Sequence, residues 1–237
     1  MDEVLRALLY GSAAGLMIPL GGALARIRGF QPRWLEQEVR HSVIAFGGGV
    51  LVAAVALVLV PEGVKALPLW TALAAFGFGG VLFAAIERGH RGHGGAHAQF
   101  IAMLADFVPE ALALGAFLAT GSPQAGLLAV LIGVQNLPEA FNAWRELRAD
   151  GRLSAQRVMV LFFGLAVLGP VAVLSGFLLL ADQPALTGTI MMIAAGGILF
   201  LMFQDIAVKA HLRNAQAPSL AALGGFAIGI VGQALTG

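Results

Sequence analysis

The chain has 237 residues, of which 59% are hydrophobic and only 11% are charged. A soluble globular domain has about 25% charged residues, so this chain lacks the charged surface that water requires on all sides. Its net charge of +1 gives no reason to expect a nucleic-acid partner. The absence of cysteine excludes disulfides, iron–sulfur clusters and thiolate zinc sites.

Eight mostly apolar stretches follow one another along the chain, and each is long enough to span a membrane, which takes about 20 residues. Charged, polar, proline or glycine residues separate them. The stretches lie near residues 4–25, 42–61, 69–87, 99–119, 124–147, 158–181, 187–210 and 218–236. We therefore predict an all-α integral membrane protein that forms a single transmembrane domain over residues 1–237, with the lipid bilayer around it.

The basic residues predict how this domain lies in the membrane. Of the 14 lysine and arginine residues, 12 fall in the first, third, fifth and seventh connections or at the span ends next to them. Arg6 and Lys65 fall on the opposite side. Because basic residues concentrate in cytoplasmic loops, we expect these four connections to face the cytoplasm and both termini to lie outside. A plasma (inner) membrane location is expected.

A weak internal repeat suggests an arrangement of three, two and three helices. Gly48–Leu51 in the second predicted helix and Gly196–Leu199 in the seventh both read Gly-Gly, an aliphatic β-branched residue, then Leu. If helices 1–3 and 6–8 are related, they enter the membrane from opposite faces, with helices 4 and 5 between them. Inverted repeats of this kind are typical of transporters. Chance similarity between glycine-rich apolar helices remains the alternative.

The fourth predicted helix carries two carboxylates and a proline. Asp106 and Glu110 are four residues apart and therefore share one helix face. Pro109 cannot donate a backbone hydrogen bond and clashes with the preceding turn. The resulting kink frees carbonyl oxygens near residue 105, which offers further oxygen ligands inside the membrane.

The fifth predicted helix repeats this arrangement. Gln135 and Glu139 share a face, Asn136 lies beside them, Pro138 precedes the glutamate, and Asn142 follows it by three residues. An ionisable residue at the centre of a membrane helix costs about 2.5–3.5 kcal/mol. Three such residues need compensation, and no basic residue lies in the middle of a predicted span. A bound divalent cation is the simplest compensation; protonation, or a position near the membrane surface, is the alternative.

These residues resemble the motifs of the ZIP (Zrt/Irt-like protein) family of divalent metal transporters. That family typically has H-N-x-P-[DE]-G in helix 4, and a polar pair, one residue and P-E-G in helix 5. The matching stretches here are Asp106–Ala111, followed by Leu112–Gly115, and Gln135–Ala140. Leu59–Glu62 resembles the L-x-P-E ending of helix 2, and Gln204-Asp205 with His211 falls where many members have histidine and acidic residues.

The resemblance implies a metal site, and the departures from it imply a modified one. Asp106 stands at the family's histidine position, Phe107 at its asparagine, and Asn136 at a residue that is often acidic or histidine. Gly169-Pro170 replaces a Glu-Pro found in many members. We therefore expect one metal site rather than two, made by Asp106, Glu110, Gln135, Asn136 and Glu139. An all-oxygen set favours manganese, iron(II) or similar hard ions, and zinc is still accepted.

Two further groups are candidates for contact with metal. His90, His93 and His97 lie in the third, cytoplasmic loop near 88–98. In the family, a histidine-rich stretch there is thought to capture or sense metal, and a solvated linker is the alternative. Asp205 is a candidate for the path of the ion.

The predicted function is transport of a divalent cation such as zinc, iron or manganese by alternating access. The resemblance implies that helices 1, 4, 5 and 6 move against a scaffold of helices 2, 3, 7 and 8, in a homodimer. The cation is the substrate, and we expect no organic cofactor, no nucleic acid and no enzymatic activity. The alternatives are a non-transporting metal sensor or scaffold, and an intramembrane metalloenzyme, which the lack of an H-E-x-x-H sequence disfavours.

Overall fold

The structure, a computed structural model, describes residues 3–27, 33–90, 95–212 and 215–236, and within these the side chains of 33–35 and 90–102 are not described. The described residues form helices and no strand. In chain order these are α1 (Glu3–Leu24), α2 (Arg33–Ala54), η1 (Val55–Leu59), α3 (Val60–Ala66), α4 (Leu69–His90), α5 (Gly95–Ala119), α6 (Gln124–Ala149), α7 (Ala155–Leu179), α8 (Pro184–Leu201), η2 (Met202–Ile206), α9 (Ala207–Ala210) and α10 (Ala217–Thr236).

Two of the eight helical rods contain a π-helical turn. In η1 the backbone N–H of Val60 donates to the carbonyl of Val55, and in η2 the N–H of Ala207 donates to the carbonyl of Met202. Each turn joins its neighbouring α-helices end to end, so α2–η1–α3 and α8–η2–α9 are continuous rods. Such π-turns are uncommon and often occur at functional sites, because the extra residue changes which side chains share a face.

The prediction of an all-helical protein with several segments able to cross a membrane is confirmed. Within the described residues, six helical segments have the length and apolar composition needed to cross a membrane. The other two long helices, α5 and α6, carry the acidic and amide residues discussed below. α2 begins at Arg33, well before the predicted span at 42, and the connection between α4 and α5 is reduced to residues 91–94.

Side chains that face outward from the bundle are apolar, as expected for contact with lipid. On α7 the side chains of Val160, Val167 and Leu178 are 70%, 62% and 63% exposed. The buried polar side chains instead face the interior of the bundle. This reversal of the usual soluble pattern agrees with the bilayer as the surrounding solvent.

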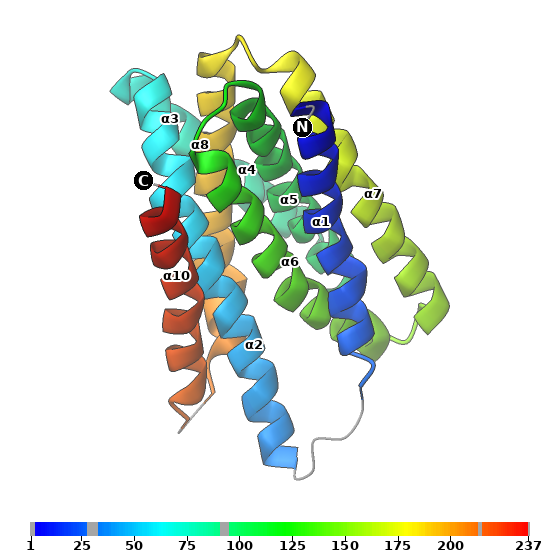
Figure 1. The fold of residues 1–237 in the computed structure, drawn as a ribbon. Coiled ribbons are helices and arrows are strands. Elements are labelled where there is room, and N and C mark those ends of the chain that lie inside the picture. Colours follow the sequence, from blue (N-terminus) through cyan, green and yellow to red (C-terminus); the bar gives the residue numbers. More distant parts are fainter. Residues whose placement is uncertain (1–2, 28–32, 91–94, 213–214, 237) are drawn as a thin grey trace.

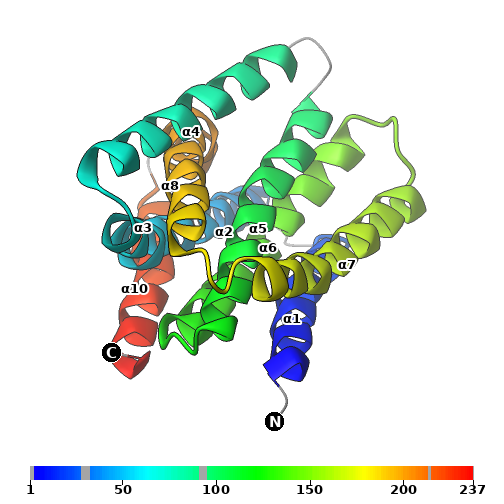
Figure 2. The ribbon, with the colours of Figure 1, turned by 90° about the horizontal axis from the view of Figure 1, so that it is seen from above.

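The helices pack in pairs around two central ones. α1 lies against α7 and α6, α2 against α10, and α4 against α8. α5 packs on α6, α7 and α8, whereas α6 packs on α5, α1 and α2. Seen from above, α5 and α6 lie between α1 and α7 on one side and the remaining helices on the other (Figure 2). The start of α1 and the end of α10 lie at the same end of the bundle (Figure 1).

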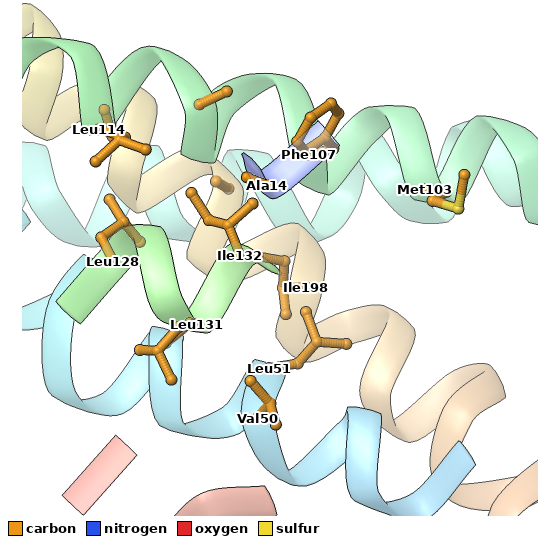
Figure 3. Close-up of a cluster of buried hydrophobic side chains, with 14 of the residues drawn as sticks. Ala14, Val50, Leu51, Met103, Phe107, Leu114, Leu128, Leu131, Ile132 and Ile198 are labelled. Atoms are coloured by element: carbon orange, nitrogen blue, oxygen red, sulfur yellow. The ribbon is translucent and has the colours of Figure 1, made fainter. Parts of the chain in front are cut away.

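Buried apolar side chains hold the central helices together. Leu51, Leu131, Ile132 and Ile198 are almost fully buried and bring α2, α6 and α8 together (Figure 3). Phe107 of α5 is 1% exposed and lies beside Ala14 of α1 (Figure 3). These contacts fix α5 and α6 against both neighbouring groups of helices, and so determine where their polar side chains meet.

Reciprocal glycine contacts allow three helix pairs to approach closely. A Cβ at Gly115 would overlap the carbonyl oxygen of Val173, and one at Gly176 would overlap that of Leu112. Gly49 and Gly225 have the same relation between α2 and α10, as do Gly79 and Gly196 between α4 and α8. Small residues at helix crossings bring backbones together in membranes, where packing rather than the hydrophobic effect drives association.

We expect Gly176→Ala to lower the unfolding midpoint, because its methyl group would collide with backbone atoms of α5 that cannot rotate away. Overpacking of this kind costs about 1–3 kcal/mol. Gly164→Ala on the same helix is the matched control, since a Cβ there meets no atom within 4 Å. Thermal unfolding of the purified protein in detergent would measure both. Equal midpoints for the two variants would contradict the close approach of α5 and α7.

Candidate metal centre

The described part of the bundle buries polar side chains where α5 and α6 meet. Glu110, Gln135 and Asn136 are each 0% exposed, and Asp106 and Asn142 are each 5% exposed. Pro109 and Pro138 lie inside the two helices, one residue before Glu110 and Glu139. Because proline lacks an N–H group, the carbonyls of Ala105 and Val134 each lose an intrahelical partner. The centre is therefore rich in oxygen atoms.

Glu110 and Gln135 form a direct link between α5 and α6. The Nε2 group of Gln135 donates a hydrogen bond to Oε2 of Glu110. This contact uses the amide's donor end and leaves its oxygen, Oε1, without a hydrogen-bond partner in the described chain. The second carboxylate oxygen of Glu110, Oε1, also has no hydrogen-bond partner in the described chain. Two acceptor oxygens therefore remain at this junction.

Asp106 lies one turn before Glu110 and Glu139 one turn after Gln135, and both line a small cavity. Its volume is about 40 Å³. Since one water molecule needs about 10–15 Å³, there is room for an ion with a small number of waters. Oδ1 of Asp106 accepts a hydrogen bond of 2.8 Å from the backbone N–H of Phe107. Both carboxylate oxygens of Glu139 are buried without a partner among the described residues.

Asn136 has a different orientation from its neighbours. Its Nδ2 group donates a 3.0 Å hydrogen bond to the carbonyl of Ala14 in α1. The amide therefore joins α6 to α1, and Asn136 is not among the residues that line the cavity of Asp106 and Glu139. Its oxygen, Oδ1, is buried and has no hydrogen-bond partner in the part of the chain described.

The unpaired polar atoms in this region are all acceptors. Within the described residues, the buried side-chain atoms of α5 and of the central part of α6 that lack a hydrogen-bond partner are oxygens of Glu110, Gln135, Asn136, Glu139 and Asn142. A buried polar group left unpaired costs about 1–3 kcal/mol. A single cation would satisfy several acceptor oxygens together, whereas a neutral hydrogen-bond donor would satisfy one.

A polar stripe runs from this centre to one end of α6. Gln135, Glu139, Asn142 and Glu146 are spaced by four, three and four residues and so lie along one face. The stripe extends over about 16 Å at 1.5 Å per residue. At its end, Nζ of Lys209 is 2.9 Å from Oε1 of Glu146 and 3.0 Å from Oδ2 of Asp205.

The structure brings Asp205 to the same cavity as Asp106 and Glu139, together with Asn142 and Lys209. Sequence reasoning did not include Asn142, Glu146 or Lys209 in the site. The regular spacing on α6 could have identified Asn142 and Glu146 from the sequence. Lys209 could be assigned only from its ion pair with Glu146 in the folded chain. His90, His93 and His97 lie outside the residues whose side chains the structure describes.

No group of three or more histidine, aspartate or glutamate side chains is gathered closely enough to hold a metal ion, as far as the described residues extend. The cluster instead combines carboxylates with amides. Glu110 is hydrogen-bonded to Gln135, whereas Asp106 and Glu139 face the cavity. The three carboxylates therefore lie near one another but do not converge on one position. Bringing them onto one ion requires side-chain rotation.

A much larger hollow lies apart from the polar cavity and is apolar. It has a volume of about 1220 Å³ and lies between α1, α2 and α6, with Tyr10, Met17, Val43 and Phe46 among its lining residues. Its walls offer few oxygen or nitrogen atoms. The polar cavity, although much smaller, is therefore the better candidate for an ion.

Comparison with known proteins gives one informative similarity. No protein-family model matches the chain. The zinc transporter GufA of Myxococcus xanthus is 32% identical to it over 130 residues, which are 52% of this chain and 51% of GufA. The chain thus covers about half the length of this curated relative. The similarity is to a metal transporter, in agreement with a membrane protein whose interior contains buried carboxylate and amide oxygens.

Proposed function

We propose that the chain is a transporter of divalent metal ions and that the ion binds where α5 and α6 meet. The observation that carries this proposal is the group of buried acceptor oxygens without hydrogen-bond partners among the described residues. Charged groups within membrane helices are expensive, and they are retained mainly where they serve ions or protons. The proposed ligands are Asp106, Glu110, Gln135, Asn136 and Glu139.

The named function of the relative supports the same conclusion. GufA is a zinc transporter, and the sequence motifs around Pro109 and Pro138 resemble a family of divalent metal transporters. A transporter as relative also agrees with the prediction that the chain is not an enzyme. The similarity leaves the ion open, and we propose zinc, iron(II) or manganese, with the harder ions favoured by an all-oxygen ligand set.

Phe107 supports a single site in place of two. Its ring is buried next to the backbone of α7, where a Cβ built on Gly169 would lie 3.2 Å from the ring's Cζ atom. The same region holds Asn136, whose amide is hydrogen-bonded to Ala14. Space that a second ion would need beside the first is therefore filled by an aromatic ring and an amide that binds protein.

We propose that helices 1–3 and 6–8 are inverted repeats around the two central helices. The packing supports this, because exchanging α1 with α7, α2 with α8, α4 with α10 and α5 with α6 reproduces the same set of helix contacts. The π-helical turns begin seven residues after Gly48 and six after Gly196, the glycines matched by the sequence repeat. Inverted repeats permit the exchange of outward- and inward-facing states around one site.

The remaining features follow from the proposed mechanism of alternating access. α1, α5, α6 and α7 would move together with the ion against α2–α4 and α8–α10. The homodimer, the inner-membrane location with both termini outside, and metal capture by His90, His93 and His97 are part of the same proposal.

We expect Glu110→Ala and Glu139→Ala each to reduce uptake of Mn²⁺, Fe²⁺ or Zn²⁺ into proteoliposomes at least tenfold, because each removes a charged oxygen ligand. The parent protein should also be stabilised by the transported ion, by about 2.7 kcal/mol at an ion concentration of 100 Kd. Thermal unfolding and calorimetry would show this stabilisation disappear in both variants.

Asp182→Ala, in the exposed turn between α7 and α8, is the control and should leave uptake unchanged. Unchanged uptake in both glutamate variants would contradict the proposed site. Metal binding without uptake in the parent protein would favour the sensor or scaffold, and no divalent binding at all would rule out both the transporter and the sensor.

Asn136→Ala separates anchoring from metal binding. Removal of its hydrogen bond to Ala14 should destabilise the metal-free protein by about 1–2 kcal/mol. The unfolding midpoint would fall by about 2–4 °C per kcal/mol in a chain of this size. Asn142→Ala is the matched control, because its amide donates only to Glu146 one turn along the same helix. Equal unfolding midpoints for these two variants would show that Asn136 does not hold α6 to α1.

A further inference from the structure

The cytoplasmic end of the polar stripe is closed by a lysine. Lys209 belongs to α9, and its ammonium group bridges Glu146 of α6 and Asp205 of η2 at 2.9 Å and 3.0 Å. Its side chain is 35% exposed, whereas that of Glu146 is 16% exposed. Lys209 is therefore partly exposed, and it also lines the cavity with Asp106 and Glu139.

We propose that Lys209 is a gate residue that closes the path between the candidate metal centre and the cytoplasmic side in the state described here. The inference rests on the proposed function for the identity of the ion, whereas the bridge that Lys209 makes between α6 and η2 is a property of the geometry alone. An ammonium group held by two carboxylates offsets one of their two negative charges and occupies their oxygens, so it weakens their attraction for an approaching divalent cation. When Lys209 leaves, Glu146 and Asp205 become oxygen ligands for an ion that moves outward from Glu139.

The π-helical turn η2 positions the residues of the gate. Asp205 lies within η2 and Lys209 lies four residues later in α9, so that both face α6 across the cavity. Asn142 links the gate to the centre, because its Nδ2 group donates a 3.1 Å hydrogen bond to Oε1 of Glu146, the oxygen that also contacts Lys209. Glu139 lies about two turns before Glu146 on the same face of α6, and Asn142 lies between them.

A second ion pair strengthens the same closure. Nη2 of Arg145 is 2.9 Å from Oε1 of Glu36 in α2. Arg145 and Glu146 are adjacent on α6 and contact two different neighbours, α2 and α9. Both ion pairs therefore cross from α6 to the helices against which it is proposed to move, and both must break if these helices separate at this end.

A single reporter thiol tests the gate without reference to transport. The chain has no cysteine, so Ile44→Cys introduces a unique thiol. Ile44 lines the cavity and is 8% exposed. The measurement is the rate at which this thiol, in inside-out vesicles, reacts with two membrane-impermeant methanethiosulfonates, one carrying trimethylammonium and the other a sulfonate.

We expect Lys209→Met to raise both labelling rates about tenfold, and Lys209→Arg to retain slow labelling. Glu146→Gln, which removes one of the two anchors, should also raise both rates. Lys65→Met is the matched control, because Lys65 is 69% exposed and pairs only locally, at 2.6 Å, with Glu62. It should leave the rates unchanged. Each variant is first required to elute as a single peak in detergent, and a variant that does not is replaced by Lys209→Gln.

Opposite changes for the two reagents would overturn the gate, since loss of a positive charge alone accelerates the cation and slows the anion. Unchanged rates in both Lys209→Met and Glu146→Gln would overturn it as well. Metal binding to the same variants, measured by calorimetry, is the separate readout for the proposed function. Faster labelling in a protein that binds no metal would support the gate and reject the metal transporter.

Discussion

The arrangement of the whole bundle depends on placing carboxylates inside a hydrocarbon slab. Glu110 and Asp106 are buried among the surrounding helices, as are the carboxylate oxygens of Glu139, and the described residues offer these three groups one side-chain donor, the amide of Gln135. Such a group of acceptors is unfavourable by itself and becomes favourable with a cation. The site is consequently incomplete as protein alone, which is the property expected of a centre that binds and then releases its ligand.

The surrounding helices maintain this arrangement through close backbone contact. Reciprocal glycines let α5 approach α7, and likewise α2 approach α10 and α4 approach α8. Tight, small-residue crossings hold each of these pairs of helices together. Near the cavity, by contrast, α2 presents Gly47 to Pro138 of α6, where a Cβ on the glycine would lie 3.0 Å from the proline ring. A smooth surface of this kind is compatible with relative movement of α6, and ion pairs limit that movement at one end.

The polar stripe of α6 unites the proposed site and the proposed gate. Gln135 contacts the innermost carboxylate, Glu139 and Asn142 line the cavity, and Glu146 holds Lys209. One helix face therefore carries the proposed ligands, the proposed path and the proposed closure. Because Lys209 occupies acidic groups that an outgoing ion would use, it acts as a tethered substitute for the ion while the path is closed.

The sequence by itself determined the membrane class, the eight helical segments and the two proline-glutamate pairs, because these depend on local composition and on periodicity along one helix. The first and fifth segments needed only small changes of boundary, whereas α2 began much earlier than its apolar stretch, since helix formation does not stop at the membrane surface. The pairing of Glu110 with Gln135, the turning of Asn136 toward Ala14 and the closure by Lys209 were decided only by tertiary structure. Each joins residues on different helices, and their rotation about the helix axis is fixed by glycine contacts and π-helical turns that no single stretch of sequence specifies.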